Sequence, residues 1–295
     1  MVLNKRSEKA YKLGVHTIFI ILCVTCIIPI WTVVAISLES GSSIAKIGYP
    51  FLIPRDFDLS SYRSILKSPT TILNAYKSTF YIALVGVPLY VIIATLCAYP
   101  LSRSDFRFRR VIVIYFLITM LFSGGTIPFY LLMTRTLGLR NSYWSMILPY
   151  LCDVWSIILL RTYMRSLPQD IFDAALIDGA GQTTIYLRFV LPLSKACIAV
   201  IAFSKFMAYW GTYSYAMYFI TDPAKYPLQF LLQNMLNNLE TIKKAMEMGL
   251  AVYEKIPGEP MRMAMVVLTI GPSILVFPLF QKYFQKGMIL GSMKG

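Results

Sequence analysis

The sequence predicts an all-α, polytopic membrane protein with six transmembrane helices and both termini in the cytoplasm. Hydrophobic residues make up 57% of its 295 positions and charged residues only 14%, which is far more apolar than a soluble domain. The apolar residues form runs long enough to span a hydrocarbon core, about 20 residues each. Lysine and arginine cluster between these runs, as they do in the cytoplasmic loops of membrane proteins.

The first apolar run, residues 14–36, follows a basic cytoplasmic segment, residues 1–13. It is too long for the core of a signal peptide and lacks an obvious small-residue cleavage site, so we expect it to remain as a membrane helix. Since no internal repeat is evident, residues 14–295 are treated as one transmembrane domain. Further spans are predicted at residues 77–101, 111–133, 143–164, 195–220 and 263–283.

The distribution of basic residues predicts the orientation of these spans. Besides both termini, residues 103–110 and 161–195 are rich in lysine and arginine, so these segments are expected in the cytoplasm. Two long loops, residues 39–76 and 221–262, mix basic with acidic residues and are expected outside. The second of these loops contains a helical apolar stripe, which fits either a packed cap or a surface that touches substrate.

One cytoplasmic segment, residues 166–195, has clear helix boundaries. Ser166 suits an N-cap and Pro168 the first turn of a short helix. Gly179 lies where helices commonly end in a left-handed residue, and a second amphipathic helix is predicted beyond it, closed by Pro192. The segment is therefore predicted to form a helix-turn-helix outside the bilayer.

The same segment carries a spaced motif: Asp173-Ala174-Ala175, three further residues, Gly179, and later Leu191-Pro192. This motif resembles the EAA loop of ATP-binding-cassette import permeases, although the family usually has glutamate where this chain has Asp173. Ala174 and Ala175 are expected on an exposed face that enters a groove of the ATPase. Taken alone, the alanine and glycine spacing also fits ordinary close helix packing.

Other stretches resemble the carbohydrate-uptake branch of these permeases, the MalG-like proteins and especially the LplC- and YtcP-like group. They are residues 122–128, residues 226–229 and the tail from residue 281 to residue 295. The resemblance covers nearly the whole chain. The residues that it assigns to coupling with the ATPase are Asp173, Ala174, Ala175, Gly179, Leu191 and Pro192.

The resemblance implies a permease subunit that forms the translocation pathway for a carbohydrate, expected to be an oligosaccharide. It implies a second permease chain, a pair of cytoplasmic ATPase subunits and an extracytoplasmic solute-binding protein or lipoprotein. ATP and Mg are expected on the ATPase subunits, with no cofactor on this chain. The implied location is a bacterial cell membrane.

Two ionisable residues lie inside predicted spans, where a charge is costly and often functional. Asp153 either faces the pathway and accepts hydrogen bonds from sugar hydroxyls, or pairs with a polar group on a neighbouring helix. Lys205 is expected close to the cytoplasmic end of its span, where its side chain reaches water. It is not predicted to be a ligand.

The fifth span is unusually rich in aromatic residues, which can stack on sugar rings or simply pack between helices. The third span is interrupted by two glycines and a proline, which frees backbone groups that need partners in protein or in a wet cavity. We therefore predict a pathway along the third, fourth and fifth spans. Its candidate residues are Asp153, Tyr209, Trp210, Tyr213, Gly124 and Gly125.

Several function classes have no support in the sequence. There is one histidine, His16, and no Gly-x-x-x-x-Gly-Lys phosphate loop, so neither an enzyme nor an ATP site is predicted. Cys23 and Cys26 fit helix packing better than a metal site, and the net charge of +14 fits membrane orientation better than nucleic-acid binding. The remaining alternatives are an ion-coupled secondary transporter, which would show paired acids or repeated broken helices, and an importer of a non-sugar solute.

Overall fold

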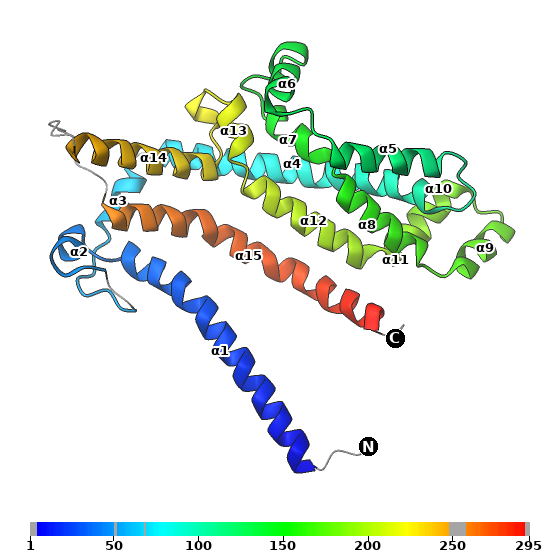
Figure 1. Cartoon of the computed structure of the whole chain (residues 1–295), viewed down its shortest axis with the longest axis horizontal. Coiled ribbons are helices and arrows are strands. Elements are labelled where there is room, and N and C mark those ends of the chain that lie inside the picture. The colour runs from blue at the N-terminus through cyan, green and yellow to red at the C-terminus, as the bar shows by residue number, and fades with distance from the viewer. Residues whose placement is uncertain (1–4, 50–51, 68, 248–257, 293–295) are drawn as a thin grey trace. The chain divides into compact units, whose positions relative to one another are not determined.

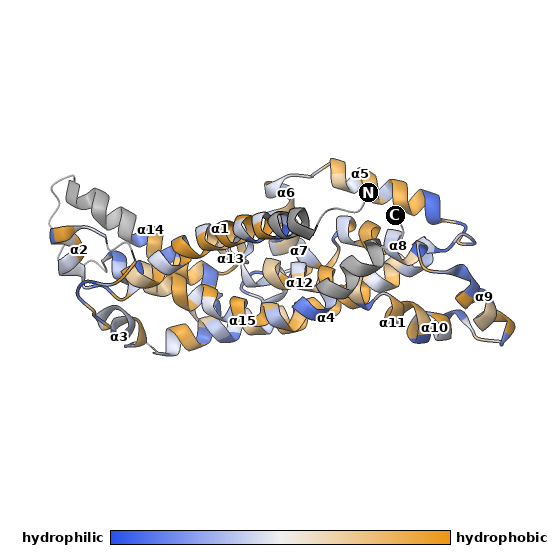
Figure 2. Ribbon diagram, turned by 90° about the horizontal axis from the view of Figure 1, so that it is seen from below, coloured by the Kyte–Doolittle hydropathy of each residue, from blue (hydrophilic) through white to orange (hydrophobic). Residues whose placement is uncertain are grey.

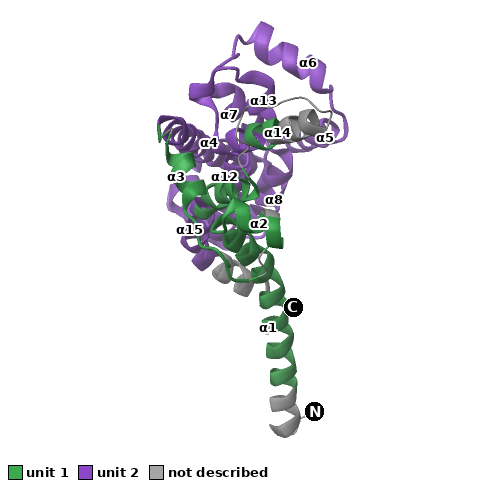
Figure 3. Cartoon of the chain, turned by 90° about the vertical axis from the view of Figure 1, so that its left-hand side faces the viewer, with its two compact units in different colours: residues 1–69, 234–271 green, residues 70–233, 272–295 purple. Residues whose placement is uncertain are grey.

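The computed structural model confirms the all-α class (Figure 1). Apart from an isolated antiparallel bridge between Glu39 and Phe57, the regular elements of the described residues are helices. The chain divides into two compact units, which Figure 3 shows in green and purple; α14 and α15 each contribute to both. The residues that the structure describes are 5–49, 52–67, 69–247 and 258–292.

The first unit comprises residues 1–69 and 234–271. The helices α1, α2 and α3 lie wholly within this unit, which also contains parts of α14 and α15. Most residues of α15 are hydrophobic (Figure 2). The helices are α1 (Lys5–Ser37), α2 (Gly41–Ile47), α3 (Ser60–Leu66), α14 (Leu228–Glu247) and α15 (Glu259–Ser292).

A buried acid organises the predicted outer loop of this unit. The Glu39 carboxylate is 1% exposed and accepts hydrogen bonds from the backbone N–H groups of Arg55 (2.7 Å) and Asp56 (3.2 Å). It also accepts the hydroxyl of Ser43, in the first turns of α2. Because a buried carboxylate needs such partners, the loop is folded back on itself rather than extended.

The second unit comprises residues 70–233 and 272–295 and contains the predicted coupling segment. Its longest helix is α4 (Pro69–Ser102). The remaining elements are α5 (Arg109–Leu121), α6 (Thr126–Leu131), the π-helix Leu132–Thr136, α7 (Trp144–Leu151), α8 (Val154–Arg165), α9 (Gln169–Ile177), α10 (Gln182–Ile185), the π-helix Tyr186–Val190, α11 (Leu191–Leu193), α12 (Lys195–Trp210), α13 (Ser214–Phe219) and the 3₁₀ turn Pro223–Lys225.

Three helices among the described residues are long and apolar enough to cross a membrane: Tyr11–Ser37, Pro69–Ser102 and Glu259–Tyr283. They contain the predicted first, second and sixth spans. Three further pairs pass the same test only if each bent pair counts as one span, which brings the total in the described residues to at most six. The number of crossings therefore stays a prediction.

The bent pairs confirm the predicted interruption at residues 111–133 and correct the prediction of continuous helices at residues 143–164 and 195–220. The first is bent by 109° between α5 and α6, and the second by 43° between α7 and α8. The third begins at Lys195 as predicted, but α12 stops at Trp210 instead of residue 220, and its bent partner is the preceding stretch Gln182–Leu193, at 76°.

Glycine and proline account for where these helices break. At the first break Gly125 has φ +87°, a backbone conformation that favours glycine. Pro149 lies one turn before the second break and removes a backbone donor there. After Trp210 the chain passes Gly211, a weak helix former, and begins again at Ser214.

Small residues on α4 allow α12 to approach closely, as is common between membrane helices. Gly86 faces the ring of Tyr209 so tightly that an added Cβ would lie 2.5 Å from Tyr209 Cζ. The Tyr209 hydroxyl donates a hydrogen bond to the backbone oxygen of Ile147 on α7, at 3.1 Å. This contact joins α4, α7 and α12 into one core.

Gly86→Ala should therefore destabilise the second unit. The ring of Tyr209 cannot withdraw from the new methyl group without losing its bond to Ile147, and overpacking of this kind typically costs about 1–3 kcal/mol. We expect a lower midpoint of thermal unfolding for the purified complex. The matched control is Gly271→Ala in α15, where an added Cβ meets nothing within 4 Å; equal midpoints for the two variants would contradict this packing.

Candidate functional site

The predicted helix-turn-helix is present in the second unit. The helix α9 (Gln169–Ile177) ends just before Gly179, whose φ of +80° confirms the predicted left-handed turn. The turn is closed by the N–H of Ala180, which donates to the backbone oxygen of Ala175 at 2.9 Å. The following helical stretch ends at Leu193, one residue beyond Pro192.

Two details of this segment differ from expectation. Ser166 does not cap α9: its hydroxyl donates back to the oxygen of Tyr163 at 2.8 Å, at the end of α8, and Pro168 takes the N-cap position. Ala175 is 5% exposed rather than on the open face. The reason is helical spacing, because Ala175 lies three residues after the buried Phe172 and so shares its face.

The open face of α9 carries small and apolar groups. Asp173 and Ala174 are exposed, and Ile177 is 86% exposed. An isoleucine so far out of the protein is suited to burial by another chain. The structure thus presents Asp173 and Ala174 outward beside Gly179, while Leu191 and Pro192 lie in the short helix that leads to α12.

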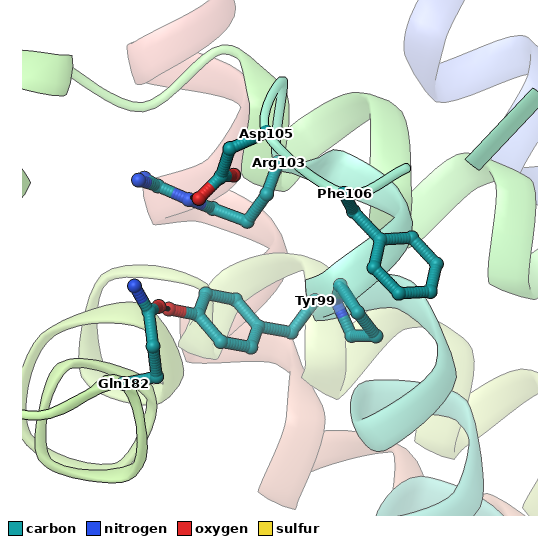
Figure 4. A pocket seen from close by; sticks show the side chains of 6 residues that line it. Tyr99, Arg103, Asp105, Phe106 and Gln182 are labelled. Carbon is teal, nitrogen blue, oxygen red and sulfur yellow. Dashed lines mark hydrogen bonds and ion pairs between the residues drawn. The ribbon is translucent and has the colours of Figure 1, made fainter. Parts of the chain in front are cut away.

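Side-chain hydrogen bonds attach this segment to the end of α4 (Figure 4). The Tyr99 hydroxyl donates to Gln182 Oε1 at 2.6 Å, as Figure 4 shows. The Tyr186 hydroxyl, which is outside that view, donates to Thr95 Oγ1 at 2.8 Å. Tyr99 and Gln182 line a hollow of about 270 Å³ together with Arg103 and Asp105, which form an ion pair at 3.6 Å. Sequence reasoning missed these residues, because partners more than eighty positions apart leave no local signal.

Arg103 also reaches the first helix of the segment. Its Nη1 donates to Gln169 Oε1 at 3.3 Å, at the start of α9, and its guanidinium carbon lies 5.7 Å from the centre of the Phe172 ring. Both parts of the helix-turn-helix therefore contact α4 or Arg103, the residue that directly follows it. A displacement of the segment would be felt at Tyr99 and Arg103.

Asp153 and Lys205 form an ion pair inside the second unit. Lys205 Nζ lies 3.0 Å from Asp153 Oδ2, and their side chains are 11% and 29% exposed. The same carboxylate oxygen accepts the Ser156 hydroxyl at 2.6 Å. Of the two roles open for Asp153, pairing with a neighbouring helix is therefore present; lining of the pathway stays a prediction.

The expectation that Lys205 reaches water was wrong. Its ammonium group lies 5.1 Å from the centre of the Tyr90 ring and 5.8 Å from that of Tyr150, within range of cation–π attraction. Asp153 lies in the break between α7 and α8, and Lys205 lies within α12. The sequence contains one indication of this ion pair, which is that both charged residues lie inside apolar runs.

The predicted pathway aromatics are mostly packed within the protein. Tyr209 is fully buried, and Trp210 is 5% exposed with its ring edge-on to Phe80 at 5.3 Å. Tyr213 is half-buried, and its hydroxyl contacts the sulfur of Met217 at 3.2 Å. These contacts are those of helix packing, and a role for these three residues in the pathway stays a prediction.

Gly124 and Gly125 lie on an open surface at the α5–α6 break. Together with Tyr215 and Tyr218 they line a groove of about 540 Å³. Among the described residues no group of three or more His, Cys, Asp or Glu could hold a metal. Of the predicted pathway residues, Asp153 thus lies in the ion pair, the two glycines line an open groove, and the three aromatic residues pack within the protein.

Comparison with known proteins identifies the family. A family model described as "Binding-protein-dependent transport system inner membrane component" matches residues 69–290, well over half of the chain. The chain belongs to this family. The resemblance drawn from the Asp173–Pro192 motif is therefore confirmed, and the protein is a membrane permease subunit of an ATP-binding-cassette (ABC) importer rather than itself an enzyme.

Relatives of this permease are similar over most of their length. The polygalacturonan/rhamnogalacturonan transport system permease YtcP of Bacillus subtilis is 32% identical over 98% of this chain and 100% of its own. The trehalose/maltose permease MalG of Thermococcus litoralis is 29% identical over 94% of each chain. A chain in the crystal structure of a bacterial ABC transporter involved in import of the acidic polysaccharide alginate superposes with a TM-score of 0.79, at 28% identity over 96% of this permease and 100% of that chain.

The ion pair of this permease can be tested by a double-variant cycle. Asp153→Asn or Lys205→Met alone should leave one charge without its partner among apolar helices, which is more costly than removing both. We expect each single variant to lower the amount of assembled complex several-fold, with partial recovery in the double variant. Strictly additive losses would mean that the two side chains do not interact.

Proposed function

We propose that this permease forms, with a second permease chain, the pathway of an ATP-driven importer for an oligosaccharide in a bacterial cell membrane. A pair of cytoplasmic ATPase subunits supplies the energy, and an extracytoplasmic solute-binding protein delivers the substrate. The single observation that carries this proposal is the α9 helix-turn-helix. It presents Asp173, Ala174 and Ile177 outward while it is hydrogen-bonded to α4.

The outward face of α9 supports contact with a separate protein. Ile177 is 86% exposed, and burial of such an apolar side chain is worth roughly 1.5–3 kcal/mol. An ATPase groove that received α9 would transmit its closure to α4 through Tyr99 and Tyr186. In this proposal Asp173, Ala174, Ala175, Gly179, Leu191 and Pro192 form the coupling element, with Ala175 acting as a packing residue that holds the open face in place.

The proposal includes six crossings, cytoplasmic termini and a cytoplasmic coupling segment. It counts the first two bent pairs as one span each and takes only α12 from the third pair, because Gln182–Leu193 belongs to the coupling segment. The basic clusters around Arg103–Arg110 and Arg161–Arg165 support the cytoplasmic side for the end of the second unit that carries α9. Figure 1 shows α9 at one end of this unit, and α6 and α13 toward the other.

This orientation predicts which sites an impermeant thiol reagent can reach. In a background without the native cysteines, Gly181→Cys should be shielded in intact cells, whereas Ile53→Cys, at a position that is 76% exposed, should be labelled. Permeabilised cells provide the control, because both sites should then react. Labelling of Gly181→Cys in intact cells would contradict the cytoplasmic placement of the coupling segment.

The substrate class rests on the relatives. Their names specify polygalacturonan/rhamnogalacturonan, trehalose/maltose and alginate, so a carbohydrate is proposed for this permease as well. The test is uptake into vesicles that contain the complete transporter and its binding protein, with neutral and acidic oligosaccharides offered separately. Uptake of a non-sugar solute and of none of the saccharides would contradict the proposal.

The rival class, an ion-coupled secondary transporter, is not favoured. It would predict paired acids within the spans, and the acid in the α7–α8 break, Asp153, is paired with a lysine instead. Family membership across residues 69–290 also points to a binding-protein-dependent system. Abolition of uptake by loss of ATP, with the ion gradients intact, would distinguish the two.

The coupling role predicts that Gly179→Val uncouples the transporter. A β-branched residue at φ +80° is strained, and the left-handed conformation costs about 1–2 kcal/mol even for ordinary residues. We expect the spans to insert and the permeases to associate normally, while sugar-stimulated ATP hydrolysis and uptake fall about five- to thirtyfold. Both activities are to be measured in the same vesicles.

Gly181→Val is the matched control. Gly181 has φ −71° and ψ 162°, a region that valine adopts readily, and a Cβ at either glycine meets nothing within 4 Å. The two variants add the same side chain two residues apart and differ mainly in backbone strain. Equal activity of the two variants at the wild-type level would rule out the Gly179 turn as part of the coupling element.

A further inference from the structure

The groove at the α5–α6 break has the dimensions of a small-molecule site. Its volume of about 540 Å³ lies within the range of typical ligand pockets, about 300–1,000 Å³. Four elements of its wall decide its chemistry: the exposed backbone at Gly124, the hydroxyl of Thr126, and the rings of Tyr215 and Tyr218. We call it the Gly124–Tyr218 groove.

The backbone keeps this groove open. The chain bends by 109° between α5 and α6, and the positive φ of Gly125 permits that bend. Gly124 has no side chain to fill the space, and an added Cβ there would meet nothing within 4 Å. The Ser123 hydroxyl accepts the N–H of Gly125 at 3.3 Å, which holds the turn in this form.

The groove combines ring faces with hydroxyl groups and carries no charge among its described lining residues. Tyr218 is 38% exposed and Tyr215 half-buried. Within the described part of the chain, neither phenol oxygen has a hydrogen-bond partner. Aromatic faces stack on the apolar faces of sugar rings, while phenol and threonine hydroxyls pair with sugar hydroxyls. This surface therefore suits a pyranose or furanose ring better than an ion or a phosphate.

A chain of ring contacts leads from the groove to the buried ion pair. The ring centres of Tyr215 and Tyr150 are 5.0 Å apart, nearly edge to face. Tyr150 in turn lies 5.8 Å from the Lys205 ammonium group, which pairs with Asp153. The groove and the polar pair are thus two ends of one continuous set of aromatic and polar side chains.

We propose that the Gly124–Tyr218 groove holds one sugar ring of the incoming oligosaccharide before it passes toward the Asp153–Lys205 pair. The proposal rests on the proposed function of the permease and adds the site at which the substrate first meets this chain. The groove lies at α6 and α13, toward the end of the second unit away from α9 (Figure 1). This is the end at which a substrate arrives if α9 is cytoplasmic.

The decisive variant is Gly124→Leu, which places an apolar side chain at the groove wall without straining the backbone around it. In vesicles with the complete transporter and loaded binding protein, we expect oligosaccharide uptake per ATP hydrolysed to fall about tenfold. Tyr218→Ala should lower the uptake per ATP hydrolysed about fivefold, which corresponds to the loss of one stacking contact. Tyr218→Phe keeps the ring and should retain most of the uptake. A merely structural defect would lower hydrolysis and uptake together and leave their ratio unchanged.

The matched control is Gly41→Leu, which adds the same side chain at another glycine with open space around it, in α2. It should behave as the wild type. Loss of the second permease from purified Gly124→Leu complex would overturn the proposal, because the groove would then be a contact between permeases. An unchanged ratio of uptake to hydrolysis in Gly124→Leu would overturn it as well.

These outcomes are separable from failure of the proposed function. If the wild-type complex imports none of the oligosaccharides, the proposed function fails and the groove proposal falls with it. If the wild type imports them and Gly124→Leu does so with the same yield per ATP, only the groove proposal fails.

Discussion

Backbone N–H and C=O groups inside a hydrocarbon core need partners within the protein, and this constraint determines where the second unit can be irregular. A continuous helix such as α4 satisfies its own peptide groups. Where the chain leaves the helical path, the structure supplies other partners. At the α5–α6 break the backbone N–H of Gly125 donates to the Ser123 hydroxyl at 3.3 Å. At the α7–α8 break the carboxylate of Asp153 pairs with Lys205 at 3.0 Å.

The helix breaks therefore bring polar groups into an otherwise apolar unit, and both substrate-site candidates lie at them. The α7–α8 break carries Asp153, and the α5–α6 break opens the groove beside Gly124. Tyr150 connects the two, because its ring contacts that of Tyr215 and lies near Lys205. Irregular backbone in a membrane protein is tolerated where it is buried in protein or lines a wet cavity.

The helix α4 links the coupling segment to these positions. Its C-terminal end holds the segment through Thr95 and Tyr99, its middle places Tyr90 at 5.1 Å from the Lys205 ammonium group, and Gly86 packs against Tyr209. A movement of α9 that pulled on Tyr99 would thus reach a helix in contact with the ion pair. A continuous series of contacts of this kind can carry coupling between two sites. Coupling also requires that α4 adopt two alternative arrangements, which an experiment has to demonstrate.

The sequence by itself determined the properties that depend on composition and on residues close together in the chain. Apolar runs predicted the long helices α1, α4 and α15, and the Asp173–Pro192 spacing predicted both the helix-turn-helix and the family. A local rule also predicted the left-handed turn at Gly179, because only glycine enters that conformation without strain.

Only the tertiary structure decided which distant residues meet. It paired Asp153 with Lys205, attached Gln182 to Tyr99, and turned Ala175 inward against the core. Hydropathy could not predict these contacts or the end of α12 at Trp210, because an apolar run looks the same whether its helix is continuous or broken. The partners of a buried charge or a small residue are chosen by packing between helices, and that information is spread over the whole chain rather than held in any one segment.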